Sequence, residues 1–417
     1  MTPGVLYLDT ARLGRMASGA RRVVRDFAGL SGEVGLPLYG EEFLRTGFSV
    51  LPPPLQRRFP ALAAWTGIAG LKSAIRELVE TTHRPEVLFA HRSAVLMRLA
   101  IGMLTARCRR VLTTDLDWSA YRNLLNVARR EFHTEVCEVP LRNFIFREKV
   151  AEGEIVSRVA SAYLRQECDG LFLTAVSHDG IRFPIVELVR EIERQRPVRM
   201  LVVDGAQAFC HVPAAAIIER ADFFVAGCHK WLGAFEPLGI AFANPTLFAT
   251  PSRRLPELLR RHGIDDPLLT FTQQFEENSR AANTETVNVA PLFACAGALK
   301  EELRGTVSNR ESFQQRLRNA NRVAAMAEEV GWKALRPAAE FQSGILLLEP
   351  TADSVVRLSP LDLRTHFHNR RISLTAYEGG CIRLSMSNRP FKPSDLDLLR
   401  TALYSAATAG QSAIPVR

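Results

Sequence analysis

Two short apolar runs, each followed by charged or polar residues, constrain this chain more than any other feature. Residues 201–203 precede Asp204, and residues 223–225 precede His229 and Lys230. The spacing from position 204 to position 230 leaves room for one crossover helix between neighbouring parallel strands. Parallel strands end at one edge of their sheet, where open α/β folds bind ligands. The sequence therefore predicts that Asp204, Gln207, His229 and Lys230 meet at that edge.

This set of side chains meets the needs of pyridoxal phosphate (PLP) chemistry. A lysine amine forms the Schiff base with the cofactor aldehyde, and an aspartate keeps the pyridine nitrogen protonated. Gln207 can hydrogen-bond the ring oxygen, and His229 can face the phosphate. The segments DGAQA and CHKWLG resemble class V aminotransferases, which include cysteine desulfurases, isopenicillin epimerases, kynureninases and cysteine C–S lyases. The alternative interpretation is a Rossmann-like core with an incidental lysine.

Strands and helices alternate along most of the chain. We expect strands at 87–90, 110–113, 171–175, 200–203, 222–226 and 239–243, in a mostly parallel sheet covered on both faces. A long helix near 289–331 and strands at 344–348, 372–375 and 381–386 predict a smaller α/β domain. The resemblance implies the PLP-dependent transferase fold type I. The expected domains are an N-terminal arm (1–20), a large PLP-binding domain (21–265) and a small C-terminal domain (266–417).

The resemblance implies further cofactor contacts. Backbone amides at a helix start near Ser93 and Ala94 would bind the phosphate, although Ser93 alone could be a plain N-cap. Trp118 follows an acidic residue and would stack on the pyridine ring. The alternative is that Trp118 is a core residue at the start of a helix. His178 matches the position beside the ring oxygen. If the alignment shifts by one, Ser177 or Asp179 takes that position instead. The other interpretation is that His178 is an ordinary surface histidine.

Two more positions concern the substrate and the partner subunit. Thr286 resembles an element that reaches the phosphate of the neighbouring subunit, which implies a homodimer with shared active sites. Arg383, in CIRLSMSN, matches an arginine that binds a substrate carboxylate in bidentate fashion, although a surface strand arginine would look the same. Together these positions imply an α-amino acid substrate.

The sequence separates the reactions of the family poorly. Desulfurases carry a mobile nucleophilic cysteine, whereas Cys381 lies two residues from Arg383 on an expected strand, so desulfurization is disfavoured. By analogy with the C–S lyase and epimerase branch, we favour lyase or deaminase chemistry on a modified amino acid, possibly a cysteine derivative, in specialised metabolism. Transamination and epimerization are the alternatives.

Bulk properties narrow the class further. The net charge of +9 comes from basic residues scattered among acids, without an aromatic-basic platform, which favours a solvated surface over a nucleic-acid face. Seven dispersed cysteines without metal-like spacing indicate buried thiols in a reducing cytoplasm and predict no metal site. No signal peptide or membrane span is expected. A non-catalytic PLP fold is disfavoured because the four residues at the sheet edge are all present.

Overall fold

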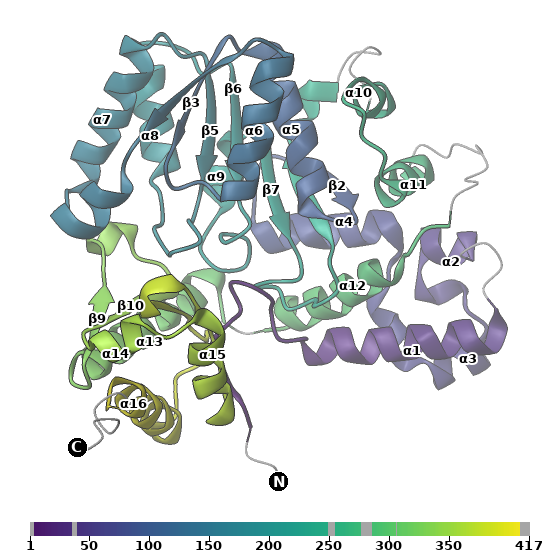
Figure 1. Ribbon diagram of the computed structural model, residues 1–417. Coiled ribbons are helices and arrows are strands. Elements are labelled where there is room, and N and C mark those ends of the chain that lie inside the picture. The colour runs from purple at the N-terminus through teal and green to yellow at the C-terminus, as the bar shows by residue number, and fades with distance from the viewer. Residues whose placement is uncertain (1–3, 36–39, 249–254, 277–285, 306, 409–417) are drawn as a thin grey trace.

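A computed structural model describes residues 4–35, 40–248, 255–276, 286–305 and 307–408 (Figure 1). It contains a large α/β domain on a seven-stranded sheet, a layer of N-terminal helices, and a smaller C-terminal α/β domain. None of the described helices combines the length and the apolar character needed to cross a bilayer.

The central sheet has the strand order β2-β8-β7-β6-β5-β3-β4. All its pairings are parallel except those of β8, which is antiparallel to β2 and β7. The mostly parallel sheet predicted from the sequence is therefore confirmed. The sequence analysis missed β4, which is a partly exposed edge strand without a continuous apolar run. The strands are β2 (Glu86–Ala90), β3 (Arg110–Thr114), β4 (Glu135–Val139), β5 (Gly170–Thr174), β6 (Met200–Asp204), β7 (Phe223–Gly227) and β8 (Gly239–Ala243).

Helices cover both faces of this sheet. Side chains alternate along each strand, so Phe223 and Val225 contribute to one core and Phe224 and Ala226 to the other. The first core is completed by α5 (Ser93–Arg107), α6 (Ser119–Glu131) and α10 (Leu255–Arg261). The second is completed by α4 (Gly67–Val79), α7 (Glu152–Arg165), α8 (Ile185–Glu193) and α9 (Ala215–Arg220).

A layer of helices follows the N-terminal arm. Helix α1 (Ser18–Val34) lies along α12 (Ala290–Leu303), and Gly19 and Gly297 allow the two backbones to touch. The sequence predicted one helix over 289–331; the structure instead ends α12 before Gly305 and starts α13 (Asn309–Glu328) with a capping box between Ser308 and Glu311. The remaining elements of this part are α2 (Glu41–Thr46), α3 (Pro53–Arg58), α11 (Pro267–Glu276) and the 3-10 turns η2 (Phe48–Val50), η3 (Pro60–Ala64) and η5 (Pro245–Phe248).

The C-terminal part has its own antiparallel sheet of order β12-β13-β10-β9 and a separate apolar core. Its core extends from Ala320 to Ala406 and includes Leu8 of the arm, whose strand β1 (Leu6–Tyr7) pairs with β11 (Ile372–Ser373). Its elements are β9 (Trp332–Leu335), β10 (Ile345–Pro350), β12 (Thr375–Ala376), β13 (Ile382–Ser385), α14 (Asp353–Val356), α15 (Pro360–Asn369), α16 (Pro393–Thr408), η7 (Ala339–Phe341) and η8 (Glu378–Gly380).

The position of the domain boundary follows from these cores. Helix α11 and helix α12 come after residue 266, yet their buried side chains belong to the two cores that flank the central sheet, and none belongs to the core of the C-terminal part. We therefore propose that the small domain begins after α12, later than the sequence pattern placed it.

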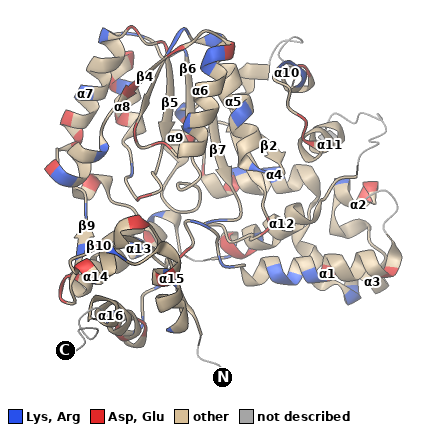
Figure 2. Cartoon of the chain, in the orientation of Figure 1, with Lys and Arg blue, Asp and Glu red and all other residues tan. Residues whose placement is uncertain are grey.

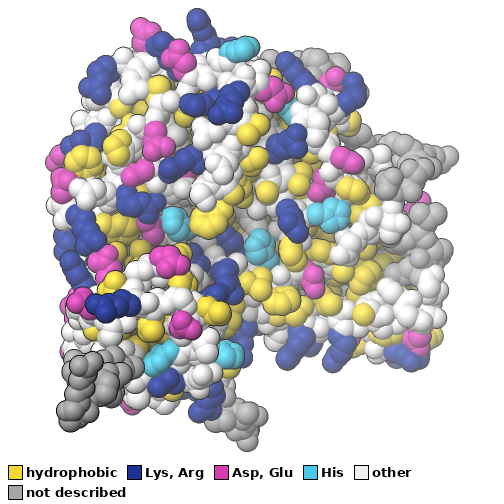
Figure 3. All heavy atoms as spheres, in the orientation of Figure 1, with side chains coloured by type: hydrophobic (Ala, Val, Ile, Leu, Met, Phe, Trp, Pro, Cys, Tyr) yellow, Lys and Arg dark blue, Asp and Glu magenta, His cyan; other side chains and the backbone are white. Residues whose placement is uncertain are grey.

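Charged side chains do not gather by sign. Figure 2 shows Lys and Arg spread over many helices with Asp and Glu among them. Figure 3 shows the two signs mixed over the visible face, with hydrophobic side chains between them. This face therefore lacks the continuous basic stripe that is typical of a nucleic-acid surface.

Candidate active site

A cavity of about 340 Å³ lies at the carboxyl ends of β5 and β6 and beside the turn after β7. Its volume lies within the usual range of small-molecule sites. It gathers residues from the large domain, the N-terminal arm and the small domain. The polar and aromatic residues on its wall are Arg12, Trp118, Tyr121, Thr174, His178, Asp204, Gln207, Lys230, Thr375, Tyr377 and Arg383.

Asp204 and Lys230 come together because β6 and β7 are neighbouring parallel strands. Asp204 is the last residue of β6, and its Oδ1 accepts a hydrogen bond from Ala206 N at 2.9 Å. Burial raises the pKa of Asp204 to about 6, and the charge of Lys230 opposes this rise. Burial lowers the pKa of Lys230, Asp204 opposes that shift, and Arg383 adds to it. A lysine with a lowered pKa has more of the neutral amine that acts as a nucleophile.

Trp118 lies at the start of α6 on the cavity wall, with 46% of its surface exposed in the single chain. Its ring meets His178 edge-on, with 5.3 Å between ring centroids. An indole in this place presents an aromatic face to the cavity but has no basic nitrogen that could carry a proton.

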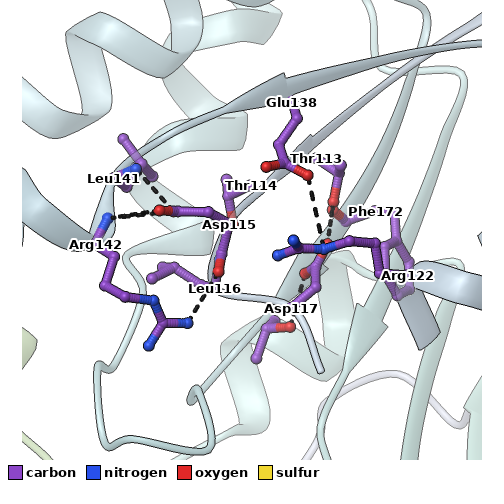
Figure 4. Close-up of polar contacts among 11 residues, drawn as sticks. Thr113, Thr114, Asp115, Leu116, Asp117, Arg122, Glu138, Leu141, Arg142 and Phe172 are labelled. Carbon is purple, nitrogen blue, oxygen red and sulfur yellow. Dashed lines mark hydrogen bonds and ion pairs between the residues drawn. The ribbon is translucent and has the colours of Figure 1, made fainter. Parts of the chain in front are cut away.

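A second buried carboxylate, Asp117 (Figure 4), directly precedes Trp118 in the chain and does not line the cavity. Its carboxyl oxygens are within hydrogen-bond distance of the hydroxyls of Thr113 and Thr174, and the Thr113 hydroxyl, which has one proton to donate, also lies 2.9 Å from the Phe172 carbonyl. Burial raises the pKa of Asp117 to about 7. The two threonine hydroxyls lower this pKa, and the nearby charge of Asp204 raises it further. The sequence offered no role for this second carboxyl.

His178 is the residue of the SHD segment that reaches the cavity. Its Nδ1 is buried without a hydrogen-bond partner in the described chain, and burial lowers the His178 pKa to about 4, helped by Arg142 and Arg383. Ser177 donates to Asp179, which also pairs with Arg142, so these two alternatives are engaged in the turn.

Gln207 is placed by two neighbours that the sequence did not indicate. Its Nε2 donates to the carbonyl of Ala11 at 2.7 Å, and its Oε1 accepts from the Trp231 indole at 2.9 Å. The Trp231 ring in turn stacks on the His211 ring, with 3.7 Å between the ring centroids. These contacts fix the amide at the cavity wall and leave its second N–H available.

Four of the residues expected at the phosphate do not line this cavity in the single chain. Ser93 approaches it indirectly, since its Oγ lies 3.2 Å from the hydroxyl of Tyr121 on the wall. Ala94 is exposed in the first turn of α5, and Thr286 is exposed just after the undescribed segment 277–285. The fourth residue is His229, which is half-buried and whose Nδ1 has no hydrogen-bond partner among the described residues. Their roles stay predictions.

Arg383 enters the cavity from β13 of the small domain with only 5% of its surface exposed. Its Nη1 donates to the His178 carbonyl at 3.1 Å and its Nη2 to Thr375 Oγ1 at 3.2 Å. Nη2 also lies 3.8 Å from a carboxylate oxygen of Asp9. Nε is buried without a partner among the described residues, so the guanidinium retains donor capacity for a ligand.

A second cavity of about 490 Å³ adjoins the first, and the two share His178 and Tyr377 in their walls. Phe146, Leu335 and Leu347 give it apolar walls, and charged pairs such as Arg147 with Glu349 lie at its edge. Asp115 also lines it and holds the next segment by accepting from the Leu141 and Arg142 amides (Figure 4).

Comparisons with known proteins give the family. The model of the family described as aminotransferase class V matches residues 61–322, which is more than half of the sequence. The chain belongs to the class V aminotransferase family. This confirms the resemblance and the type I fold predicted from the sequence, and it makes the chain a PLP-dependent enzyme.

Solved structures share the fold of this class V aminotransferase at low identity. The cystine C–S lyase C-DES in complex with cysteine persulfide is 13% identical with a TM-score of 0.68, over 96% of this chain and 97% of the other. The pyridoxamine–pyruvate aminotransferase from Mesorhizobium loti is 14% identical with a TM-score of 0.68, over 100% and 95%. The cysteine desulfurase CsdA from Escherichia coli is 15% identical with a TM-score of 0.66, over 96% and 94%. No curated protein sequence matches.

The cavity residues fit the cofactor that the family uses. Asp204 keeps one carboxylate oxygen without a hydrogen bond among the described residues, Lys230 is a half-buried amine on the cavity wall, and Trp118 supplies an aromatic face. On the cavity wall, Nδ1 of His178 is buried without a partner among the described residues, and so is Nδ1 of His229, which lies next to Lys230 in the chain but outside the wall. Buried polar atoms are rarely left unpaired, so their presence here is consistent with a polar ligand.

Proposed function

We propose that this chain acts at Cα and Cβ of an α-amino acid, with C–S lyase or deaminase chemistry. The observation that carries the proposal is that Lys230, Asp204 and Arg383 line one cavity. An amine and a carboxylate at one end serve a cofactor, and a guanidinium at the other serves a substrate carboxylate. The cofactor held by Lys230 and Asp204 would take the substrate amine, and Arg383 would take the substrate carboxylate, so the cavity would match both groups of an α-amino acid.

When bound, PLP supplies an electron sink for the electron pair left at the substrate Cα. Asp204 would hold a proton on the ring nitrogen, because an ionised carboxylate in a buried site stabilises a neighbouring cation. Lys230 would be the residue that bonds the cofactor aldehyde and, once released, carries a proton at its Nζ. Arg383 would orient the substrate through its carboxylate, and Trp118 would pack its aromatic face against the cofactor ring and so hold the ring in place.

Cys381 argues against a persulfide-carrying desulfurase. It is half-buried and precedes β13 directly, and it lines the adjoining second cavity but not the cavity that holds Lys230. Burial raises the pKa of its thiol to about 12, so the nucleophilic thiolate is scarce near neutral pH. A cysteine on such a short connection has little freedom to carry sulfur away from the site.

The second cavity supports elimination of a group larger than a simple thiol. A substituent at the substrate Cβ would extend past His178 and Tyr377 into the second cavity, whose wall combines apolar side chains with charged ones.

The experiment is to incubate the PLP-loaded enzyme with a panel of cysteine thioethers and plain amino acids. Lyase chemistry predicts keto acid, ammonia and thiol in equal amounts without an added amino acceptor. Amino-group transfer that depends on an added keto acid, with no thiol released, would show an aminotransferase instead. Cys381→Ser should leave the rate within about twofold, whereas a loss of all sulfur release would contradict the argument against a desulfurase.

A further inference from the structure

The N-terminal arm links the two parts of the site. Ala11 N donates to Ser385 Oγ on the small-domain strand at 2.9 Å, and the Ala11 carbonyl accepts from Gln207 at 2.7 Å. Three residues later, Gly14 N donates to the His229 carbonyl at 2.7 Å. In Figure 1 the purple arm runs from the small domain to the centre of the molecule before it enters α1. The backbone on either side of residue 12 is therefore fixed.

Arg12 extends from this fixed backbone to the cavity wall, which it shares with Arg383. Asp9 lies between the two guanidinium groups: Oδ2 is 3.2 Å from Arg12 Nε, and Oδ1 is 3.8 Å from Arg383 Nη2. The Asp9 side chain is 5% exposed, whereas that of Arg12 is 59% exposed. Among the described residues, the two terminal nitrogens of Arg12 have no hydrogen-bond partner, so they are available to a ligand.

The charges at this end of the cavity do not cancel. Two guanidinium groups face one carboxylate, which leaves an excess of one positive charge. One carboxylate from a substrate would balance it, and two guanidinium groups can hold a carboxylate by several charged hydrogen bonds. An amine, an amide or an ester in the same place would leave the excess charge unbalanced.

We propose that Arg12 binds the substrate α-carboxylate together with Arg383, so that the site selects free amino acids over amines, amides and esters. The proposal rests on the proposed function, in which Arg383 meets that carboxylate. Asp9 positions both guanidinium groups from the arm. Arg12 could not be selected from the sequence, because its place in the site depends on contacts between segments far apart in the chain.

The test uses two probes that react with the cofactor aldehyde and differ in charge. Aminooxyacetate carries a carboxylate, and O-methylhydroxylamine does not. Their second-order rate constants are followed by the visible absorbance of the PLP-loaded enzyme, so no turnover is needed. Arg15→Gln is the matched control, because Arg15 is exposed on the same arm and outside the cavity wall.

Arg12→Gln should lower the second-order rate constant of aminooxyacetate about tenfold or more, as expected for a lost charged hydrogen bond. It should change the rate constant of O-methylhydroxylamine by less than about twofold. Arg12→Lys should recover part of the loss. Equal slowing of both probes, or a result like that of Arg15→Gln, would overturn the inference. If Arg383→Lys slows aminooxyacetate while Arg12→Gln does not, only this inference fails. If Arg383→Lys has no effect either, the proposed amino-acid carboxylate site fails with it.

Discussion

Replacing Asp204 by asparagine removes a charge from the proposed cofactor site and keeps its shape. The Ala206 amide can still donate to the Oδ1 of an asparagine, so the turn after β6 has no reason to rearrange. What is lost is the anion that would stabilise a protonated ring nitrogen. Asp204 is 4% exposed, so water cannot replace that anion.

The expected loss follows from the burial of the site. Two opposite unit charges 4 Å apart attract by roughly 4 kcal/mol at an effective dielectric constant of 20. Each 1.36 kcal/mol of barrier is a factor of ten in rate, so the full loss would approach about 10³. Part of the interaction survives as a neutral hydrogen bond, and we therefore expect kcat to fall by about 10² or more.

Asp117→Asn is the matched control, because it neutralises the neighbouring buried carboxyl that does not line the cavity. Both variants are purified with PLP, and kcat is measured with the best substrate at pH 8. Asp204→Asn should lose about 10² while Asp117→Asn stays within about tenfold. Near-normal turnover of Asp204→Asn would refute the reasoning, and a larger loss in Asp117→Asn would assign the role to Asp117.

Four further outcomes are expected. Burial raises the Asp117 pKa from 3.8 to about 7, so the stability that this carboxyl contributes is present below pH ~4 and is lost as the pH rises through 7. Asp117→Asn should therefore raise the melting temperature of the cofactor-free protein more at pH 8 than at pH 5. The reverse order would contradict this expectation. Gly14→Ala places a Cβ on the Lys230 carbonyl and should cost about 1–3 kcal/mol in thermal unfolding, whereas Gly4→Ala, in open space, should be silent. Arg383→Lys should cost on the order of 1.5–3 kcal/mol in kcat/KM for amino acids but not for the corresponding amines; equal losses would remove the carboxylate role. Sedimentation should show a homodimer if Thr286 serves the partner's cofactor, and a fully active monomer would exclude that role.

The sheet and the pair at its edge could be predicted from sequence because both depend on local patterns. The apolar runs before Asp204 and after Asp222 form buried neighbouring strands, as expected. The edge strand β4 and the short β9 were missed because partly exposed strands lack such runs. The break between α12 and α13 was missed because helical residues continue on both sides of Gly305.

The rest of the candidate site could not be predicted because it depends on long-range packing. Arg12 comes from the arm, and Thr375 and Tyr377 come from the small domain, so only the docking of these segments brings them to Lys230. Asp117 was noted only as the acid before Trp118, since its burial and hydroxyl partners depend on strands β3 and β5.

The central claim is that Lys230 holds the cofactor. Purified protein reconstituted with PLP should be yellow, and borohydride reduction followed by peptide mass mapping should place the reduced cofactor on the peptide that contains Lys230. Lys230→Ala should bind PLP reversibly, show no label after reduction and not turn over. Label on a different lysine, or absence of label in protein that retains bound PLP, would contradict the account.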